Sequence, residues 1–304
     1  METADIDFLI SPCRICPRKC GADRQSSVGF CGAGKNPRVA KAYLHMWEEP
    51  CISGTRGSGT VFFSGCSLKC CYCQNYKISA ESFGADISPK ALGDIFLRLR
   101  DKGAHNINLV TPTHYIPQII IALDSVKHRL DIPIVYNTGG YDSVSSLKLI
   151  DDYIDIYLTD IKYRSSVLSK KYSDAEDYFD VASAAAEFMI SQKGKPVFDE
   201  SGLMKSGVII RHMVLPSCRR DSEDILDYIH SEFGCGSFLL SLMSQYTPFY
   251  RSSEHKEINR RISTYEYECV VEKARELGFE GYMQERSSAK EEYTPDFDLS
   301  GVFE

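Results

Sequence analysis

The 304-residue sequence lacks the features that would place it in a membrane, outside the cell or on a nucleic acid. No run of apolar residues approaches the length needed to span a bilayer. The first ten residues carry Glu2, Asp5 and Asp7 in place of the basic start and apolar stretch of a secretory signal. The formal net charge is −7, which argues against nucleic-acid binding. We therefore expect a cytoplasmic protein that binds neither a membrane nor a nucleic acid.

The sequence also lacks internal repeats and low-complexity tracts, and its bulk composition is that of an ordinary globular protein. Apolar residues make up 43% of the chain and charged residues 25%. A chain of this length fits one α/β barrel or two ordinary domains, and it can bury a sizeable core without disulfides. Its twelve cysteines are therefore better explained by metal binding in a reducing compartment than by disulfide bonds.

The cysteines fall into two clusters and a scattered remainder. One cluster lies in the first 31 residues, and the other lies between residues 66 and 73. A lone cysteine is usually a small buried apolar residue, and we interpret the remaining four in that way. These are Cys51, Cys218, Cys235 and Cys269.

Short apolar runs alternate with longer amphipathic stretches along most of the chain. The apolar runs predict buried parallel strands at 60–64, 106–111, 132–137, 154–159, 207–214 and 237–242. Helices are expected at 89–102, 115–129, 142–151, 174–192, 221–232 and 265–277. Ser88 is the expected cap of the first helix, and Pro89 its first residue. This alternation predicts an α/β fold, a parallel barrel or part of one, with functional residues at the carboxyl ends of its strands.

A cysteine-rich loop follows the first predicted strand. Cys66, Cys70 and Cys73 have a C-x3-C-x2-C spacing, which lets a short loop wrap three thiolates around one cluster. Soft thiolates suit iron–sulfur clusters or zinc, and three of them leave a site open for reaction. The alternative is a zinc knuckle or a set of buried cysteines. Cys71 breaks the spacing, and we interpret it as a bystander.

This loop, with Tyr72 before its last cysteine, resembles the signature of the radical S-adenosylmethionine (SAM) superfamily. The resemblance implies a partial (β/α)6 barrel, and a [4Fe–4S] cluster on the three cysteines whose open iron binds SAM. It also implies reductive cleavage of SAM to a 5′-deoxyadenosyl radical, which abstracts a hydrogen atom. Segments along nearly the whole chain are similar to an uncharacterised branch related to pyruvate formate-lyase activating enzyme. They are residues 62–79, 106–118, 134–142, 156–163, 207–216 and 242–248.

The same resemblance implies that polar residues at the strand ends bind SAM. Asp160 and Lys162 match the Asp-x-Lys motif that closes the fourth strand of activating enzymes, beside the methionine part of SAM. An ordinary ion pair near a strand end is the alternative. Asn137 departs from the family pattern, because an Asp is usual there. The other candidate cofactor contacts are Tyr72, Thr111, Thr113, Asn137, Thr138 and Gln245.

Two further residues are candidates for catalysis or substrate binding. His114 follows the second strand, where it is a candidate to contact substrate or move a proton, and a satisfied buried histidine is the alternative. Arg211 and His212 are adjacent in the fifth strand, so their side chains point to opposite sides. We favour Arg211 as the residue that faces the interior and pairs with a carboxylate of SAM or substrate.

The N-terminal cysteines form a second set of candidate ligands. Cys13, Cys16, Cys20 and Cys31 stand among Pro and Gly residues, which suits a tight metal knuckle. Four thiolates close a site, so its metal is expected to be structural or electron-carrying, as zinc or an auxiliary iron–sulfur cluster. The alternative is free thiols in a floppy leader. We expect a cysteine-rich extension over residues 1–45 and the barrel over residues 46–304.

Three functions are compatible with these patterns. The first is an activase that abstracts hydrogen from a backbone glycine of a partner, a glycyl radical enzyme. The second is a radical SAM enzyme that modifies a small molecule or a peptide side chain. The third is a non-catalytic metal-binding scaffold, which polar groups at the strand ends make the weakest alternative. Either enzyme needs an electron donor, and the family implies flavodoxin or ferredoxin.

Overall fold

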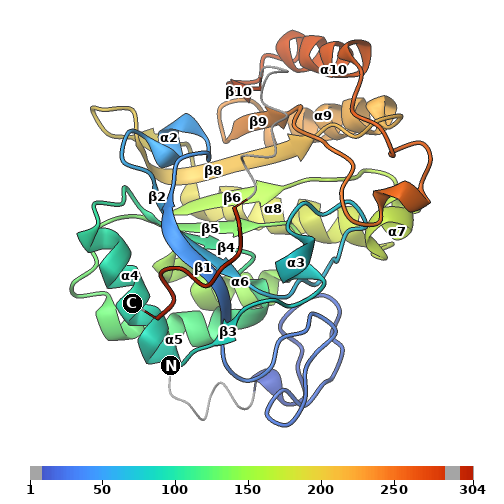
Figure 1. Ribbon diagram of the computed structural model, residues 1–304. Coiled ribbons are helices and arrows are strands. Elements are labelled where there is room, and N and C mark those ends of the chain that lie inside the picture. The colour runs from blue at the N-terminus through green and yellow to red at the C-terminus, as the bar shows by residue number, and fades with distance from the viewer. Residues whose placement is uncertain (1–8, 285–294, 304) are drawn as a thin grey trace.

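The computed structural model describes residues 9–284 and 295–303. Residues 1–8 of the expected extension, and residues 285–294 and 304 of the expected barrel, lie outside the described residues. The fold is built on one twisted sheet with the strand order β10-β9-β8-β6-β5-β4-β2-β1-β3 (Figure 1). Within the described residues β10 and β3 are the two ends of this order, so the sheet is open and the expected partial barrel is confirmed.

All six predicted strands are present and run parallel to one another. They are β2 (Ser58–Phe63), β4 (Ile107–Val110), β5 (Ile134–Thr138), β6 (Ile156–Asp160), β8 (Met204–Met213) and β9 (Leu239–Met243). Every residue of β2, β4, β5, β6 and β9 is buried. A parallel strand covered on both faces has a continuously apolar sequence, which is why the pattern predicted these strands.

Four strands were not predicted. β1 (Arg38–His45) runs antiparallel to β2, β3 (Ala85–Asp86) antiparallel to β1, and β7 (Val197–Phe198) antiparallel to β8. β10 (Gly281–Met283) extends the sheet in parallel beside β9. Three of these strands have only two or three residues, and β1 mixes Arg and Lys with small apolar residues, so none has a clear apolar run.

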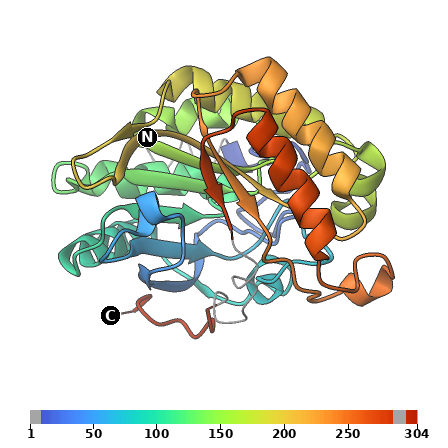
Figure 2. The same cartoon turned by 90° about the horizontal axis from the view of Figure 1, so that it is seen from above.

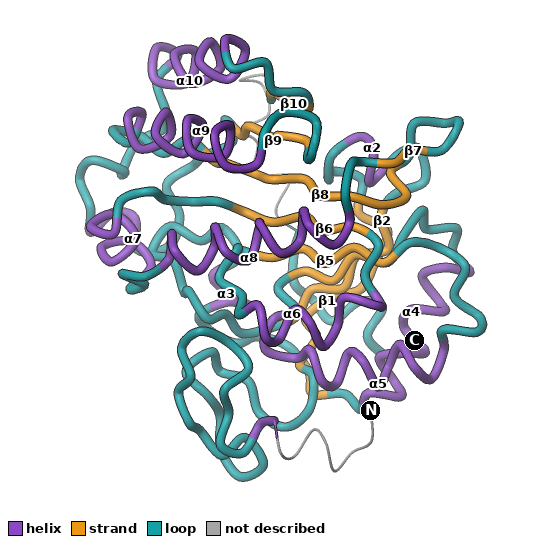
Figure 3. Tube along the Cα trace, turned by 180° about the vertical axis from the view of Figure 1, so that it is seen from behind, coloured by secondary structure: helices purple, strands orange, loops and turns teal. Residues whose placement is uncertain are grey.

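Six helices lie on one face of the sheet (Figure 3). They are α4 (Pro89–Asp101), α5 (Ile116–Val126), α6 (Val144–Ile150), α8 (Tyr178–Lys193), α9 (Arg219–Phe233) and α10 (Thr264–Glu276). All six were predicted, although α8 begins four residues later than expected. Residues 174–177 form the turn that follows a separate helix, α7 (Ser166–Ser173). The short helices α2 (Pro50–Ser53) and α3 (Tyr76–Ser79) lie in loops. No helix in the described ranges is long and apolar enough to cross a membrane.

Two chain ends pack against this framework. The C-terminal segment 295–303 lies along β1 (Figure 2), where Ala42 N donates to Ser300 O and Leu299 N donates to Ala40 O. The N-terminal segment before β1 forms loops beside α3 and the start of α6 (Figures 1 and 3). There Ile15 O accepts a hydrogen bond of 2.8 Å from Ser143 Oγ.

The scattered cysteines only partly follow the prediction. Cys51 and Cys218 are buried, as expected. Cys235 is exposed and Cys269 is half-buried, so the prediction was wrong for both. Cys235 lies in the turn between α9 and β9. Its Sγ is 3.2 Å from Leu277 O, and the side chain stays exposed to solvent.

The cap of α4 gives a first test of the local structure. Ser88 Oγ accepts a hydrogen bond from Ala91 N, and Pro89 occupies the first turn, as predicted. We expect Ser88→Ala to lower the free energy of unfolding by about 1 kcal/mol, because one helical N–H loses its acceptor. Ser191→Ala, an exposed site inside α8, is the matched control and should leave stability unchanged or raise it. Equal effects of the two changes in denaturant unfolding would contradict the assignment of the cap.

Candidate active site

A cavity of about 240 Å³ lies at the carboxyl ends of the parallel strands. Its apolar wall includes Phe62, Phe63, Val110, Met213 and Met243. Polar groups from the loops after β2, β4, β5, β6 and β9 complete the lining. Because parallel strands bring their carboxyl ends to one edge of the sheet, side chains far apart in sequence meet here.

The cysteine loop forms one side of this cavity. Cys66, Cys70 and Cys73 all line it, whereas Cys71 is buried and is not among the described residues of the lining. Each of the three sulfurs accepts a hydrogen bond. Leu68 N lies 3.4 Å from Cys66 Sγ, Ser173 Oγ 3.0 Å from Cys70 Sγ, and Ser79 Oγ 3.3 Å from Cys73 Sγ. Hydrogen bonds to sulfur stabilise the thiolate form that a metal binds.

These three sulfurs fit an iron–sulfur cluster. Burial, followed by repulsion from Cys70, raises the pKa of the Cys73 thiol to about 12, and burial likewise raises the pKa of Cys70. A positive metal centre removes both penalties, because a coordinated thiol is deprotonated. Within the described ranges no three His, Cys, Asp or Glu side chains are arranged so that they could hold a single metal ion. The thiolates of a four-iron cluster bind separate irons, so they need not converge in that way.

Gly65 lets the loop begin next to the N-terminal segment. Its φ is +92°, and a Cβ there would lie 2.5 Å from the carbonyl oxygen of Cys31. Only glycine meets both conditions without strain. The next amide, Cys66 N, donates to the same oxygen at 3.1 Å. The loop is therefore held by the N-terminal segment at its first cysteine.

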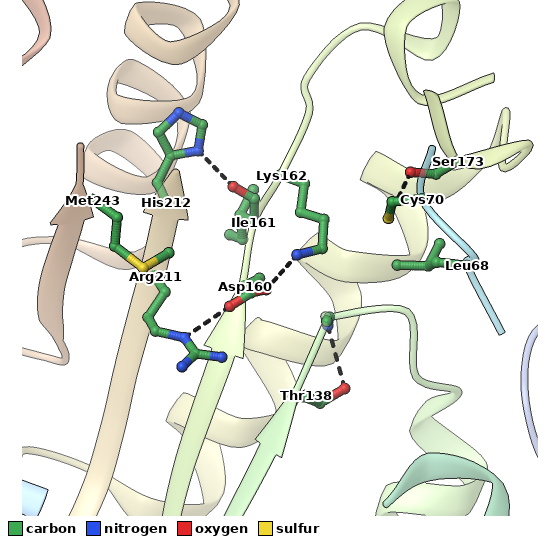
Figure 4. Close-up of polar contacts among 12 residues, drawn as sticks. Leu68, Cys70, Thr138, Asp160, Ile161, Lys162, Ser173, Arg211, His212 and Met243 are labelled. Carbon is green, nitrogen blue, oxygen red and sulfur yellow. Dashed lines mark hydrogen bonds and ion pairs between the residues drawn. The ribbon is translucent and has the colours of Figure 1, made fainter. Parts of the chain in front are cut away.

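Asp160 lies between two cations on the opposite side of the cavity (Figure 4). Its carboxylate accepts from Arg211 Nε at 2.8 Å and forms a short ion pair with Lys162 Nζ. Burial alone would raise the pKa of Asp160, but Arg211 and Lys162 together hold it below its ordinary value. Asp160 is therefore a carboxylate at neutral pH.

Glu48 extends this network and was missed in the sequence. Its carboxylate accepts from Asn108 Nδ2 at 3.0 Å and Asn137 Nδ2 at 3.2 Å, and lies 3.4 Å from Arg211 Nη1. Burial raises the pKa of Glu48, and Arg211 opposes that rise. The available signal was the acidic pair at residues 48–49 before Pro50, but a charge pair in a loop is normally solvated, and β1 was not recognised.

The cavity gathers most of the predicted cofactor contacts. The predicted residues in its lining are Tyr72, Thr111, Asn137, Thr138, Asp160, Lys162, Arg211 and Gln245. Thr113 and His114 are buried but are not among the described lining residues. Thr113 Oγ1 instead donates to Asp142 Oδ1 at 2.7 Å, and Thr138 Oγ1 donates to the other oxygen of that carboxylate at 2.5 Å.

The two adjacent residues of β8 face opposite ways, as the strand alternation predicts. Arg211 lines the cavity, and Arg211 Nη2 donates to Asn137 Oδ1 at 2.7 Å. His212 points away from it (Figure 4), with Nδ1 2.6 Å from Ile161 O and Nε2 2.9 Å from Ser222 Oγ. His114 is likewise fixed outside the cavity, with Nε2 2.9 Å from Ser64 O.

The four N-terminal cysteines lie outside the cavity lining in the described part of the chain. Cys13, Cys16 and Cys31 are buried, and Cys20 is exposed. Arg24, only 1% exposed, lies among them with Nη1 3.8 Å from Cys13 Sγ. A buried guanidinium beside four thiols suits a site whose sulfurs carry negative charge.

Comparisons with known proteins agree with the fold and the cysteine loop. A sequence profile of the radical SAM superfamily matches residues 60–229, more than half of the chain. The uncharacterized protein MJ0674 of Methanocaldococcus jannaschii is 32% identical over 282 residues, covering 88% of this chain and 75% of the relative.

One solved structure shows the same fold at low sequence identity, and a second has a lower similarity score. The FeFe-hydrogenase maturase HydG from Carboxydothermus hydrogenoformans is 15% identical, with a TM-score of 0.53 over 75% of this chain and 53% of its own. SuiB of Streptococcus suis, in a structure bound to S-adenosylmethionine, is 13% identical, with a TM-score of 0.49 over 72% of this chain and 48% of its own. The chain thus spans about half the length of these two structures.

Removing Arg211 tests the ion network. Arg211→Met leaves the largely buried Glu48 without its cation and leaves Asp160 with Lys162 alone, so we expect a loss of about 3–5 kcal/mol in the free energy of unfolding. Adding Glu48→Gln to this variant should restore part of the loss, because it removes the uncompensated charge. Arg251→Met breaks an exposed pair with Glu254 and should change stability little. Strictly additive effects of the Arg211 and Glu48 changes would show that the pair is not coupled.

His212 gives the site a pH dependence. Burial lowers its pKa from 6.5 to about 4, so below pH 6.5 the unfolded chain binds a proton that the folded protein does not. Its share of stability is complete above pH 6.5 and falls as the pH drops toward 4, by up to about 3 kcal/mol. We expect His212→Gln to make the fall in unfolding free energy over this range smaller, and the exposed-site change His128→Gln to leave it as in wild type. Identical pH profiles for His212→Gln and wild type would refute this origin of acid sensitivity.

Proposed function

This chain belongs to the radical SAM superfamily, and from that membership we propose that it is an enzyme that cleaves SAM reductively and abstracts a hydrogen atom from its substrate. The observation that carries the proposal is the cavity, where Cys66, Cys70 and Cys73 face the Asp160 and Lys162 pair. When bound, a [4Fe–4S] cluster and SAM together supply a 5′-deoxyadenosyl radical. The residues of the chain hold and orient these groups.

Asp160 and Lys162 are suited to exchange their mutual ion pair for the two charges of an amino acid group. Lys162 Nζ carries the donors for a carboxylate, and Asp160 the acceptors for an ammonium. Arg211 stays on the other oxygen of Asp160 and keeps it ionised during the exchange. The charged groups are thus paired before and after SAM binds, which limits the cost of burying them.

The apolar wall protects the chemistry. Phe62, Phe63, Val110 and Met213 line the cavity, and Tyr72 lies buried beside them with its hydroxyl 2.6 Å from Tyr163 Oη. A site lined in this way excludes water, which would otherwise quench reactive intermediates. Thr111, Thr138 and Gln245 add hydrogen-bonding groups for the rest of the cofactor.

The preferred substrate in this proposal is a glycine in the backbone of a glycyl radical enzyme. It is supported by the resemblance to the activating-enzyme branch and by an open barrel whose carboxyl edge can admit a peptide loop. A glycyl radical detected by electron paramagnetic resonance in such a partner, after incubation with this protein, SAM and a reductant, would support it. A small molecule or a peptide side chain is the alternative, and the largely buried Glu48 and Arg211 pair in the cavity wall favours a polar group on it. Its signature is faster formation of 5′-deoxyadenosine when that substrate is added without a glycyl radical enzyme.

The remaining parts of the proposal concern the setting of the reaction. We propose a cytoplasmic enzyme that receives electrons from flavodoxin or ferredoxin. The exposed basic residues Arg14 and Lys19 of the N-terminal segment support an acidic donor protein, and SAM cleavage driven by each reduced donor tests it directly. We also propose that the N-terminal segment, within residues 1–45, holds a second metal centre of zinc or iron and sulfide.

Substitutions in the cysteine loop test the central proposal. Cys70→Ala removes a cluster ligand and should abolish 5′-deoxyadenosine formation in anaerobic protein reconstituted with iron and sulfide and given SAM and dithionite. Cys71→Ala is the matched control, because Cys71 is the neighbouring buried cysteine outside the cavity lining, and it should retain cluster and activity. Wild-type activity in Cys70→Ala would sink the assignment, and loss of the cluster in Cys71→Ala would show that the ligand set is wrong.

A further inference from the structure

The N-terminal cysteines share a backbone feature with the cysteine loop that carries Cys66, Cys70 and Cys73, here called the cluster loop. In five cysteines the sulfur lies near the backbone amide two residues further along the chain, and at Cys66 this contact is a hydrogen bond of 3.4 Å from Leu68 N. Two of them, Cys66 and Cys73, lie in the cluster loop. The others, Cys16, Cys20 and Cys31, belong to the N-terminal set. This local turn aims both the sulfur and an N–H donor at one point, which is how a backbone supports a metal thiolate.

The four N-terminal sulfurs are also neighbours in space. The sulfur of Cys16 lies within electrostatic range of the sulfurs of Cys31, Cys13 and Cys20. A Cβ placed on Gly29 would lie 3.5 Å from the sulfurs of both Cys20 and Cys31, so these two thiols flank one glycine. As these side chains lie, no three of them surround a point where a single ion would sit, so zinc requires the sulfurs to draw together, whereas the irons of a cluster bind separate thiolates.

Arg24 supplies the positive charge that such a site needs. It is buried, and its guanidinium donates to Gly34 O at 2.7 Å and to His114 O at 2.7 Å as well as approaching Cys13 Sγ. Tyr115 lies under the guanidinium at 5.5 Å from its ring centre. These contacts fix the charge beside the sulfurs and tie it to the loop after β4.

The same segment grips the cluster loop at two places. Cys31 O accepts from Cys66 N at 3.1 Å. Arg18 Nε donates to Ser67 O at 2.9 Å, and Arg18 Nη2 donates to Ser173 O at 3.1 Å. Ser173 Oγ in turn donates to Cys70 Sγ at 3.0 Å. Two cluster ligands are therefore positioned through residues that belong to, or stand between, the N-terminal cysteines.

We propose that Cys13, Cys16, Cys20 and Cys31 bind a thiolate metal centre, and that this centre is a clamp that holds the cluster loop in place. Between Cys16 and Cys31 the chain forms turns and bends but neither helix nor strand, so it has little regular structure of its own. A metal that cross-links four points supplies the missing rigidity. The clamp rests on the proposed function, which assigns a cluster to the loop and a second metal centre to the N-terminal segment.

The metal content of the anaerobically purified wild-type protein is the first test. The loop cluster accounts for about four irons per chain. The proposal expects, in addition, about one zinc or a second set of irons with sulfide. Zinc would identify a structural clamp, and iron an electron-carrying one. A chain that never holds metal beyond one cluster overturns the proposal without any variant.

Two variants separate metal binding from clamping. Cys13→Ser combined with Cys16→Ser should lose the additional metal and should lose the loop cluster several-fold faster in air than wild type. Cys235→Ser, at an exposed cysteine outside both sets, is the control and should match wild type. Arg18→Met keeps all four thiols, so it should retain the additional metal but still shorten the lifetime of the loop cluster. Wild-type cluster lifetimes in both the double variant and Arg18→Met would refute the clamp.

The remaining outcomes are also decisive. If the double variant is insoluble, the wild-type metal count and Arg18→Met still test both halves of the proposal. Formation of 5′-deoxyadenosine is measured on the same wild-type sample. SAM cleavage without an additional metal overturns the clamp and leaves the proposed SAM cleavage standing. Additional metal in a protein that forms neither a loop cluster nor 5′-deoxyadenosine overturns the proposed SAM cleavage and leaves the N-terminal metal centre standing.

Discussion

Asp160 carries a buried charge, and the site depends on how that charge is compensated. A lone carboxylate in a barrel interior would take up a proton, because desolvation favours its neutral form. Arg211 and Lys162, each touching one of its oxygens, reverse that preference. Neither cation is free to leave without a replacement, since that would strand the carboxylate. A ligand with its own paired charges is therefore the kind of molecule that can enter at low cost.

The same requirement explains why Glu48 lies inside the barrel. Arg211 has more donors than Asp160 can accept, and Asn137 and Glu48 take the others. Asn108 and Asn137 then satisfy the second oxygen of Glu48. The network is thus nearly closed by hydrogen bonds, which is the condition under which buried charges are tolerated. It links the chain before β2 to the strands β4, β5, β6 and β8. The network therefore fixes the side of the cavity that faces the cysteine loop.

How much of this was visible in the sequence depended on the range of the signal. The apolar runs of β2, β4, β5, β6, β8 and β9 and the cap at Ser88 are local, and the strand ends then brought Asp160 and Arg211 to one edge. The spacing of the cysteines was also local, and it separated Cys71 from its neighbours. Glu48 was hidden because only the pairing of β1 with β2 carries it under Arg211. Thr113 and His114 were misplaced relative to the cavity because both lie in the 3₁₀ turn after β4, which directs them at Asp142 and Ser64.

Ser173 shows how the separate parts converge on the cluster loop. Its hydroxyl lies 2.8 Å from Tyr163 Oη and 3.0 Å from Cys70 Sγ, while its carbonyl accepts from Arg18. Tyr163 continues the chain of hydroxyls to Tyr72, which lines the cavity beside the loop. Hydrogen bonds to a ligand sulfur withdraw charge from it and make a cluster easier to reduce. A shift of the N-terminal segment would therefore reach the cavity through the peptide of Ser173, even if the loop cysteines themselves moved little. The contact between Arg18 and Ser173 thus affects both the position of the cluster loop and the ease with which a cluster bound there is reduced.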